Sequence, residues 1–282
     1  MDIPSQTVVA IQGIAGSFHD EAAAKCFPGG YVPLPCETFR DMFIFLKKRK
    51  AEYAVMAIEN TVAGTILPNY ALLRTSQMAI IGEVYLAIRQ NLLTLPGQKL
   101  EQIREVHSHP MAIQQCQTFF EKHPHIRLVE TSDTAASASW IAEHHKKGFG
   151  AIASKRAAHL FGLQVLAAGI ETDKRNFTRF LVLHQRSALN GTPPPPDKAS
   201  LAFHVPHMRG SLARVLTILA EEGCNLTKIQ SLPVVGREWE YYMHVDLEFD
   251  ANEQYHAALA AITPHVHELT ILGEYPRGKK IV

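Results

Sequence analysis

Thr178 and Arg179 place a hydroxyl beside a fixed positive charge, within the segment 176–180, Asn-Phe-Thr-Arg-Phe. An apolar run that breaks at Gly169 precedes this segment, and a strand-like run, 180–183, continues from it. A guanidinium can hold a carboxylate, and a hydroxyl can donate a hydrogen bond to a departing group. The pair therefore predicts a site for an anionic substrate, in which Thr178 assists the leaving group. Arg179 either binds a substrate carboxylate or ties two parts of the protein together.

A second polar cluster directly follows the apolar run 54–58, which is typical of a buried strand. Glu59 is its first member, and burial there would favour the protonated carboxyl, a rival proton donor to the threonine hydroxyl. Asn60 and Thr61 offer uncharged hydrogen-bonding groups that suit the orientation of a ligand. Gly64 permits a positive φ angle or a close approach of the backbone.

A third cluster begins at Ser108, two residues before Pro110. Proline in a first turn is typical of a helix start, and the pattern predicts a helix over 111–122. Because the amino end of a helix attracts anions, we expect Ser108 to bind the substrate. Gln115 falls near the second turn of this helix, on a side that can face the same site.

Composition limits the classes of function. The chain has 282 residues, 46% hydrophobic and 20% charged, with a formal net charge of +1, so we expect no nucleic-acid partner. The first residues do not resemble a signal peptide, and no run of about 18 apolar residues suggests a membrane span. The four cysteines lack Cys-x-x-Cys spacing, which predicts reduced thiols and a cytoplasmic location. Two pairs of alternating histidines, His107 with His109 and His265 with His267, have no further ligand candidates at a recognised spacing, so we expect no metal site.

A proline-rich linker over 187–198 divides the chain into two regions, 1–186 and 199–282. In the first region, β-type runs alternate with helical stretches, which predicts an α/β fold with parallel sheets and with ligand chemistry at the carboxyl ends of strands. In the second region, the elements follow a βαββαβ order, which predicts a ferredoxin-like fold.

The three clusters occur in an order that resembles prephenate dehydratase. Two further motifs of that family are matched by the opening turn Gly13-Ile14-Ala15-Gly16-Ser17-Phe18 and by the stretch Thr131-Ser132-Asp133-Thr134-Ala135-Ala136, so the resemblance spans nearly the whole chain.

The resemblance implies decarboxylative dehydration of prephenate to phenylpyruvate, in L-phenylalanine biosynthesis and without a cofactor. It implies a catalytic domain similar to periplasmic binding proteins, with subdomains at about 1–79 with 175–186, and at 80–174. It places the catalytic threonine at Thr178 and binding positions at Ser108 and Gln115. Ser17, in the opening turn, is a further candidate for binding a carboxylate through its amide.

The region 199–282 resembles an ACT regulatory domain, a fold that binds amino acids at paired interfaces. The match rests on residues before the first helix and after it: Gly210, Ser211, Leu212, Asn225 and Leu226. It implies L-phenylalanine as effector and a homodimer or homotetramer. The family usually has Glu-Ser-Arg-Pro where this chain has Gln-Ser-Leu-Pro over 230–233, so the direction of any response is left open.

Two alternatives share these residues. An arogenate dehydratase would act on the amino analogue of prephenate, and the sequence separates the two activities poorly. A non-catalytic amino-acid sensor would keep the fold without turnover, but it would have no need of a proton donor at Thr178 or Glu59.

Overall fold

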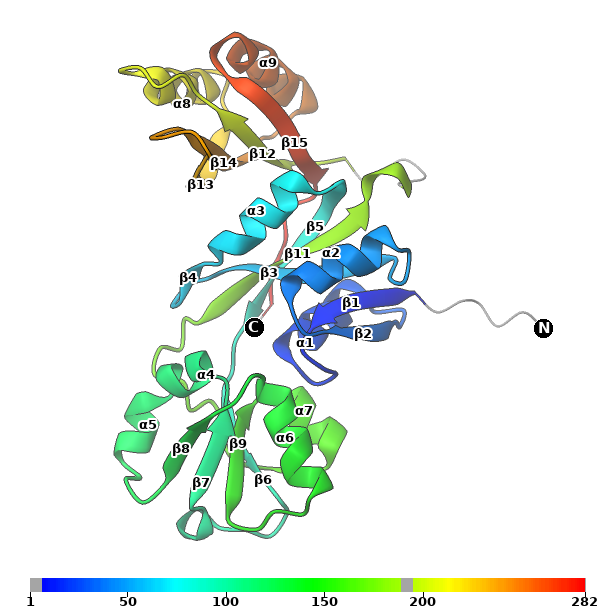
Figure 1. The fold of residues 1–282 in the computed structure, drawn as a ribbon, viewed down its shortest axis with the longest axis vertical. Coiled ribbons are helices and arrows are strands. Elements are labelled where there is room, and N and C mark those ends of the chain that lie inside the picture. Colours follow the sequence, from blue (N-terminus) through cyan, green and yellow to red (C-terminus); the bar gives the residue numbers. More distant parts are fainter. Residues whose placement is uncertain (1–6, 189–194, 282) are drawn as a thin grey trace, which may run out of the picture. The chain divides into compact units, whose positions relative to one another are not determined.

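The computed structural model describes residues 7–188 and 195–281 (Figure 1). Contacts between Cα atoms divide the chain into two compact units. The first unit comprises Met1–Thr65, Val84–Phe180 and Lys280–Val282, and the second comprises Ile66–Glu83 and Leu181–Lys279. The strands β5 (Met78–Ala87) and β11 (Phe177–Gln185) each continue from one unit into the other.

The first unit begins with a parallel sheet in which β1 lies between β2 and β3. Its elements are β1 (Val8–Gln12), α1 (Phe18–Cys26), β2 (Val32–Cys36), α2 (Phe39–Lys47), β3 (Tyr53–Asn60) and the short β4 (Gly64–Thr65), which pairs antiparallel with β3. Residues 54–58 of β3 are all buried, as a strand in the middle of a core requires. Ser17 caps α1 by accepting a hydrogen bond from the amide of Asp20, and a capping box between Thr38 and Asp41 starts α2.

A five-stranded sheet in the same unit has the order β10-β6-β9-β7-β8. Its elements are β6 (Asn91–Thr94), η1 (Leu100–Gln102), β7 (Glu105–Ser108), α4 (Pro110–Gln115), α5 (Gln117–Glu121), β8 (Arg127–Glu130), α6 (Thr134–Glu143), β9 (Phe149–Ala153), α7 (Lys155–Phe161) and β10 (Gln164–Ala167). Leu92 and Ile152 pack with α4 and α5, whereas Leu93 and Ala151 pack with α6 and α7. Because side chains alternate along a strand, the helices cover both faces of this sheet (Figure 1).

Two expectations about this unit need correction. The predicted helix over 111–122 is two short helices, because the carbonyl of Gln115 accepts a hydrogen bond from the amide of Thr172 and Cys116 leaves helical geometry at φ −105° and ψ 10°. The five-stranded sheet is mixed rather than parallel, since β6 pairs antiparallel with both β9 and β10. No helix separates β5 from β6.

The second unit contains a four-stranded antiparallel sheet with the order β13-β14-β12-β15. Its elements follow the predicted βαββαβ order: β12 (Lys198–His204), α8 (Ser211–Glu221), β13 (Asn225–Pro233), β14 (Tyr241–Glu248), α9 (Asn252–Ile262), η3 (Thr263–His265) and β15 (His267–Tyr275). Leu201 and Phe203 of β12 form a core with Val215 and Leu219 of α8. The same unit includes α3 (Leu67–Thr75) and η2 (Arg186–Ala188), and α3 contacts β14, where the guanidinium of Arg74 lies 3.8 Å from the ring centroid of Tyr242.

Residues 189–194, half of the predicted linker, lie outside the described residues. The short strand β16 (Lys280–Ile281) pairs parallel with β5. In the described part of the chain, no helix is long and apolar enough to cross a membrane.

Candidate functional site

The hydroxyl of Thr178 lies within hydrogen-bonding distance of the Asn60 side chain. Asn60 is the last residue of β3, and its Nδ2 donates to Thr178 Oγ1 over 2.9 Å. Both side chains are buried, each with a relative exposure of 8%. Because the hydroxyl oxygen accepts this bond, the hydroxyl hydrogen remains to be donated to another group.

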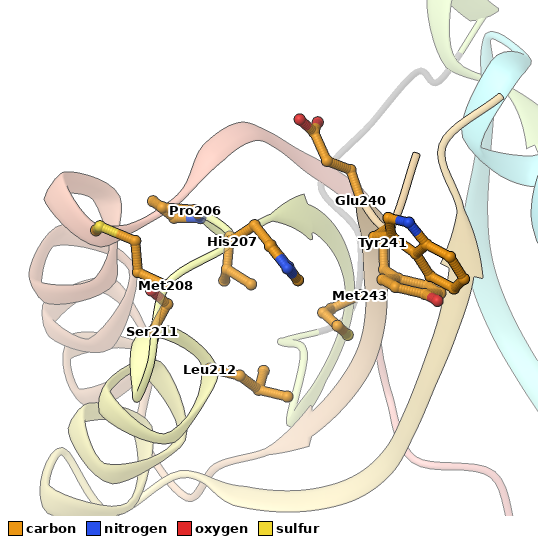
Figure 2. Close-up of a pocket in the computed structure, with 10 residues that line it drawn as sticks. Pro206, His207, Met208, Ser211, Leu212, Glu240, Tyr241 and Met243 are labelled. Carbon is orange, nitrogen blue, oxygen red and sulfur yellow. The ribbon is translucent and has the colours of Figure 1, made fainter. Parts of the chain in front are cut away.

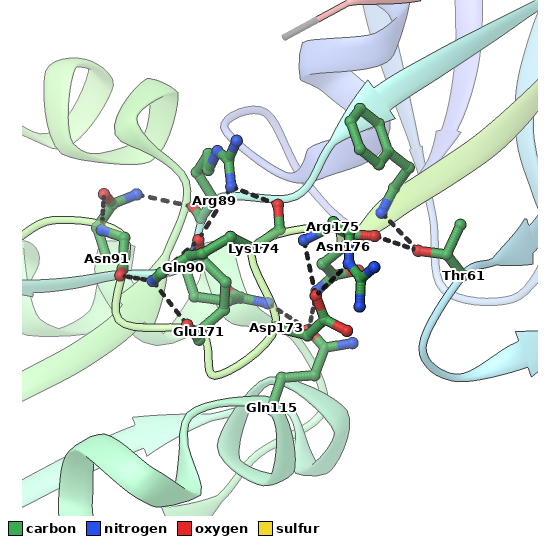
Figure 3. Close-up of polar contacts among 12 residues, drawn as sticks. Thr61, Arg89, Gln90, Asn91, Gln115, Glu171, Asp173, Lys174, Arg175 and Asn176 are labelled. Atoms are coloured by element: carbon green, nitrogen blue, oxygen red, sulfur yellow. Dashed lines mark hydrogen bonds and ion pairs between the residues drawn. The ribbon is translucent and has the colours of Figure 1, made fainter.

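The amide network extends from Asn60 to three further side chains, those of Asn176, Gln115 and Gln90, whose contacts with one another are drawn in Figure 3. The same Asn60 Nδ2 donates to Asn176 Oδ1 over 2.7 Å. Asn176 Nδ2 donates to Gln115 Oε1 over 2.9 Å, and Gln90 Nε2 donates to that oxygen over 3.1 Å. Of the two predicted binding residues, Asn60 contacts Thr178 directly, and Gln115 is linked to Asn60 through Asn176, a residue that was not among the predicted site residues.

Backbone contacts hold the β3 end against the start of β11. The amide of Thr61 donates to the carbonyl of Phe177 over 2.9 Å, and the Thr61 hydroxyl donates to the carbonyl of Arg175 over 2.8 Å. The Thr61 hydroxyl oxygen also accepts from the amide of Phe177. The hydroxyl of Thr61 therefore joins two segments of backbone, and Gly64 begins β4 after the turn at φ +85°, which favours glycine.

Glu171 anchors the loop that leads to Asn176. Its carboxylate is buried, accepts from the amide of Gln90 over 2.9 Å and pairs with Arg89 at 3.3 Å and with Lys174 at 3.4 Å. A buried carboxylate is stable only when such partners replace its water. Glu171 could not be predicted from the sequence, because its partners Arg89 and Gln90 lie about 80 positions away in the chain.

A pocket of about 650 Å³ opens beside this network. It is lined by Gln115 and Asn176 together with Val62, Ala63, Met111, Gln114, Gln117, Thr118, Glu121, Glu171, Thr172 and Asp173. Thr178 is not among these residues, so the pocket adjoins the Asn176 and Gln115 end of the network. Amide and hydroxyl groups dominate its polar lining, which suits a ligand with several hydrogen-bonding oxygens.

Glu59 and Arg179 leave their strands on the faces opposite to Asn60 and Thr178, because neighbouring side chains alternate along a strand. Glu59 is half-buried and pairs in register with Thr65 of β4. Arg179 is buried, with its guanidinium 5.9 Å from the ring centroid of Tyr85. The structure thus gathers Asn60 and Thr178 on one side and directs the two charged candidates to the other.

Ser108 and Ser17 have structural partners. The buried Ser108 hydroxyl donates to the carbonyl of Ile152 over 2.7 Å, so it can offer a ligand only its oxygen. Ser17 caps α1, and its amide donates to the carbonyl of Ile14 over 3.1 Å. Neither residue is among those that line the pocket beside Asn176.

The opening turn is held by a buried carboxylate. Asp20 accepts from the amide of Gly16 over 2.8 Å, from Arg156 Nε and from the hydroxyl of Tyr31. Ser154, the cap of α7, donates to the carbonyl of Gly16 over 2.6 Å. Burial and the hydrogen bond to Asp20 raise the pKa of Tyr31. This cluster fixes the turn against α7 and is structural.

A second pocket, of about 180 Å³, lies in the second unit (Figure 2). Ser211 and Leu212, two of the predicted regulatory residues, line it with Val205, Pro206, His207, Met208, Trp239, Glu240, Tyr241 and Met243. Gly210 precedes α8 at φ +81°. Asn225 and Leu226 begin β13 and are not among the lining residues.

No group of three or more His, Cys, Asp or Glu side chains within residues 7–188 and 195–281 is arranged to hold a metal ion. The four cysteines are all free thiols, and burial raises the pKa of Cys36 and of Cys116 to about 12.

Comparison with known proteins identifies the family. The family model of prephenate dehydratase matches residues 9–188. Arogenate dehydratase 2 of Petunia hybrida is 36% identical, over 98% of this chain and 73% of its own length.

Two solved structures share the fold. One, described as GqqA, a novel type of quorum quenching acylase, has a TM-score of 0.86 and 32% identity, and covers 96% of this chain and 98% of its own. The prephenate dehydratase of Arthrobacter aurescens, in complex with L-Phe, has a TM-score of 0.85 and 27% identity, and covers 98% of this chain and 92% of its own. The predicted α/β fold class is confirmed. The chain belongs to the prephenate dehydratase family and is an enzyme of that type.

Proposed function

We propose that this protein converts prephenate into phenylpyruvate. In this reaction the bond between the ring and its carboxylate breaks and releases carbon dioxide. The electron pair moves into the ring, the ring hydroxyl leaves and takes up a proton to form water, and the ring becomes aromatic. The protein therefore has to hold a dianion and donate a hydrogen bond to the departing oxygen.

The observation that carries this proposal is the hydrogen bond from Asn60 to Thr178. It orients a buried hydroxyl so that its oxygen accepts and its hydrogen is left to donate. A donor held in place before the reaction stabilises developing charge without reorganisation, which is worth about 10²–10³ in rate for a single group. Thr178 is the proposed donor, and Asn60, Gln115 and their partners are the proposed binding groups.

The proposal is tested by following phenylpyruvate formation from prephenate by the purified protein, beside its Thr178→Val variant. Turnover by the wild type with a loss of about a hundredfold in the variant supports the assignment. Absence of turnover by the wild type refutes prephenate as substrate.

Arogenate is the second candidate substrate. A relative with 36% identity is named arogenate dehydratase 2. Glu121 and Asp173 line the pocket beside Asn176, and their carboxylates would attract the ammonium group that arogenate has in place of the keto oxygen of prephenate. The ratio of kcat/KM for the two substrates, measured on one preparation, decides between them.

The likeness to the quorum quenching acylase makes an acyl-transfer activity a third reaction to measure. An acylase releases an acyl chain, so the assay follows acyl release from an N-acyl amide under the conditions of the prephenate assay. Acyl release at a higher kcat/KM than prephenate turnover would overturn the proposed function.

The region 199–282 is proposed to act as an ACT regulatory domain that binds L-phenylalanine, in a homodimer or homotetramer, joined by the linker 187–198 to a catalytic domain over 1–186. A relative with 27% identity is described in complex with L-Phe. The pocket of the second unit combines apolar groups, such as Leu212 and Met243, with polar groups, such as Ser211. We expect L-phenylalanine to raise the melting temperature of the wild type and to have less effect on Leu212→Lys. An equal shift in both would exclude this pocket.

A further inference from the structure

Two backbone N–H groups determine which way each side-chain carboxamide in the network is oriented, that is, where its oxygen and its nitrogen lie. The amides of Val62 and Ala63 donate to Asn60 Oδ1 over 2.9 and 2.7 Å. A backbone N–H can only donate, so the oxygen of the Asn60 carboxamide has to face these two groups. Its nitrogen therefore faces Asn176 and Thr178 and donates one hydrogen bond to each.

The orientation of the Asn60 carboxamide also determines the orientations of the Asn176 and Gln115 carboxamides. Asn176 presents its oxygen to Asn60, so its nitrogen faces Gln115 Oε1 at 2.9 Å. Gln90 Nε2 donates to the same oxygen over 3.1 Å, which holds Gln115 in one orientation. The Nε2 of Gln115 is then turned away from both donors, on a residue that lines the 650 Å³ pocket.

We propose that Asn176 is a positioning residue that transmits this direction, so that both ends of the network, Thr178 and Gln115, present hydrogen-bond donors to the substrate. Asn176 has 1% relative exposure and acts through its two neighbours. The inference rests on the proposed function, because donors at both ends suit a substrate that carries carboxylates and expels a hydroxyl. A network of the opposite direction would present an oxygen from Gln115 and would repel a carboxylate.

Two variants that each add one negative charge distinguish the role of Thr178 from the role of Gln115. Asn176→Asp still accepts from Asn60, so Thr178 keeps its direction, but it cannot donate to Gln115. Gln115 then rotates its nitrogen toward Asp and exposes its oxygen. We expect KM to rise about tenfold or more, the loss of one hydrogen bond to a charged group, with kcat within about threefold of wild type.

Asn60→Asp removes the donor to Thr178, so the threonine donates to the new carboxylate instead of the leaving group. The new carboxylate also accepts from Asn176, so the carboxamides of Asn176 and Gln115 both take the opposite orientation. We therefore expect kcat to fall about a hundredfold and KM to rise as well. Asn252→Asp, at the exposed first residue of α9, controls for an added charge and is expected to leave both constants unchanged.

Equal effects of Asn176→Asp and Asn60→Asp on kcat and KM would overturn the inference, because simple repulsion of an anion would act alike at both positions. If Asn176→Asp fails to fold, Gln115→Glu replaces it: both accepted hydrogen bonds remain and only the outward donor is lost, so KM should rise while kcat is kept.

A measurement that needs no turnover keeps the inference separate from the proposed function. The side-chain NH2 of Asn60 is expected to show both hydrogens protected from exchange in NMR spectra of the wild type, and the NH2 of Gln115 to exchange fast. Fast exchange at Asn60 would refute the network direction. Failure of the wild type to convert prephenate or arogenate would refute only the function.

Discussion

The carboxamide of Asn60 donates to the hydroxyl of Thr178 over 2.9 Å, although 118 positions separate the two residues in the chain. The bond joins the end of β3 to the start of β11, two strands whose ends are tied together by Thr61. The bond orients the Thr178 hydroxyl as a donor, because its oxygen already accepts from Asn60 and its hydrogen is left for another group.

Replacing Thr178 by valine keeps the shape of the side chain and removes the donor. We expect kcat to fall about a hundredfold or more, and the free energy of unfolding to fall by about 1–3 kcal/mol because one buried Nδ2 hydrogen of Asn60 loses its acceptor. Thr178→Ser keeps the hydroxyl and is expected to retain most of the turnover. Steady-state kinetics with the preferred substrate, together with thermal unfolding, measures both effects. Wild-type kcat in the valine variant would rule out the hydroxyl as donor.

Glu59→Gln tests the rival proton donor. Because Glu59 leaves β3 on the face opposite to Asn60, we expect kcat to fall less than in Thr178→Val. The pH profile of kcat supplies a second test: if Glu59 delivers the proton, its loss should remove the limb on which activity declines as pH rises. A larger loss in Glu59→Gln than in Thr178→Val would transfer the role to the glutamate.

Arg156→Met removes the cation that faces the buried Asp20 carboxylate. The uncompensated charge costs free energy, but the Arg156 side chain is 42% exposed, so we expect a loss of about 2 kcal/mol in the free energy of unfolding rather than the full cost of a buried pair. Arg127→Met is the matched control, since the Arg127 side chain is 70% exposed beside Glu105, and its replacement should cost much less stability. Urea unfolding of the two variants checks the difference, and equal losses would contradict the role of burial.

His244 makes stability depend on pH. Its ring is 1% exposed, and its pKa is lowered to about 4 by burial and, to a smaller extent, by Arg74, while Asp246 opposes the shift. The unfolded chain takes up a proton near pH 6.5 and the folded chain does not, so stability is present above pH 6.5 and is lost as pH falls toward 4. The expected loss is about 3 kcal/mol.

His244→Phe is expected to reduce the slope of this dependence, and the remaining slope is expected from His19, whose pKa is lowered to about 3 by burial. Neither ring nitrogen has a hydrogen-bond partner in the described part of the chain, and the ring packs edge-on against Tyr70 with centroids 5.1 Å apart. Phenylalanine therefore removes two buried polar atoms without removing the ring contact, and stability at pH 7 should be equal or higher. His159→Phe, at an exposed position of α7, should keep the wild-type slope between pH 6.5 and 4. An unchanged slope in His244→Phe would refute this assignment.

Local signals in the sequence were sufficient for many elements of the fold. Pro110 starts α4, and the apolar run 54–58 is the buried part of β3, because a proline at a helix start and a buried strand are both determined by neighbours in the chain. The break of the predicted helix at Cys116 was missed, because its cause is a hydrogen bond from Thr172, which is distant in the chain.

The sequence by itself determined the chemical groups available at this site: a threonine hydroxyl, two amides and a glutamate at the ends of apolar segments, in an order that resembles one enzyme family. Only the tertiary structure decided which of them meet and in which direction each hydrogen bond runs. Asn176, Gln90 and Glu171 entered the site in this way. The physical reason is that an amide can donate or accept, and its choice is fixed by partners that folding brings from other parts of the chain.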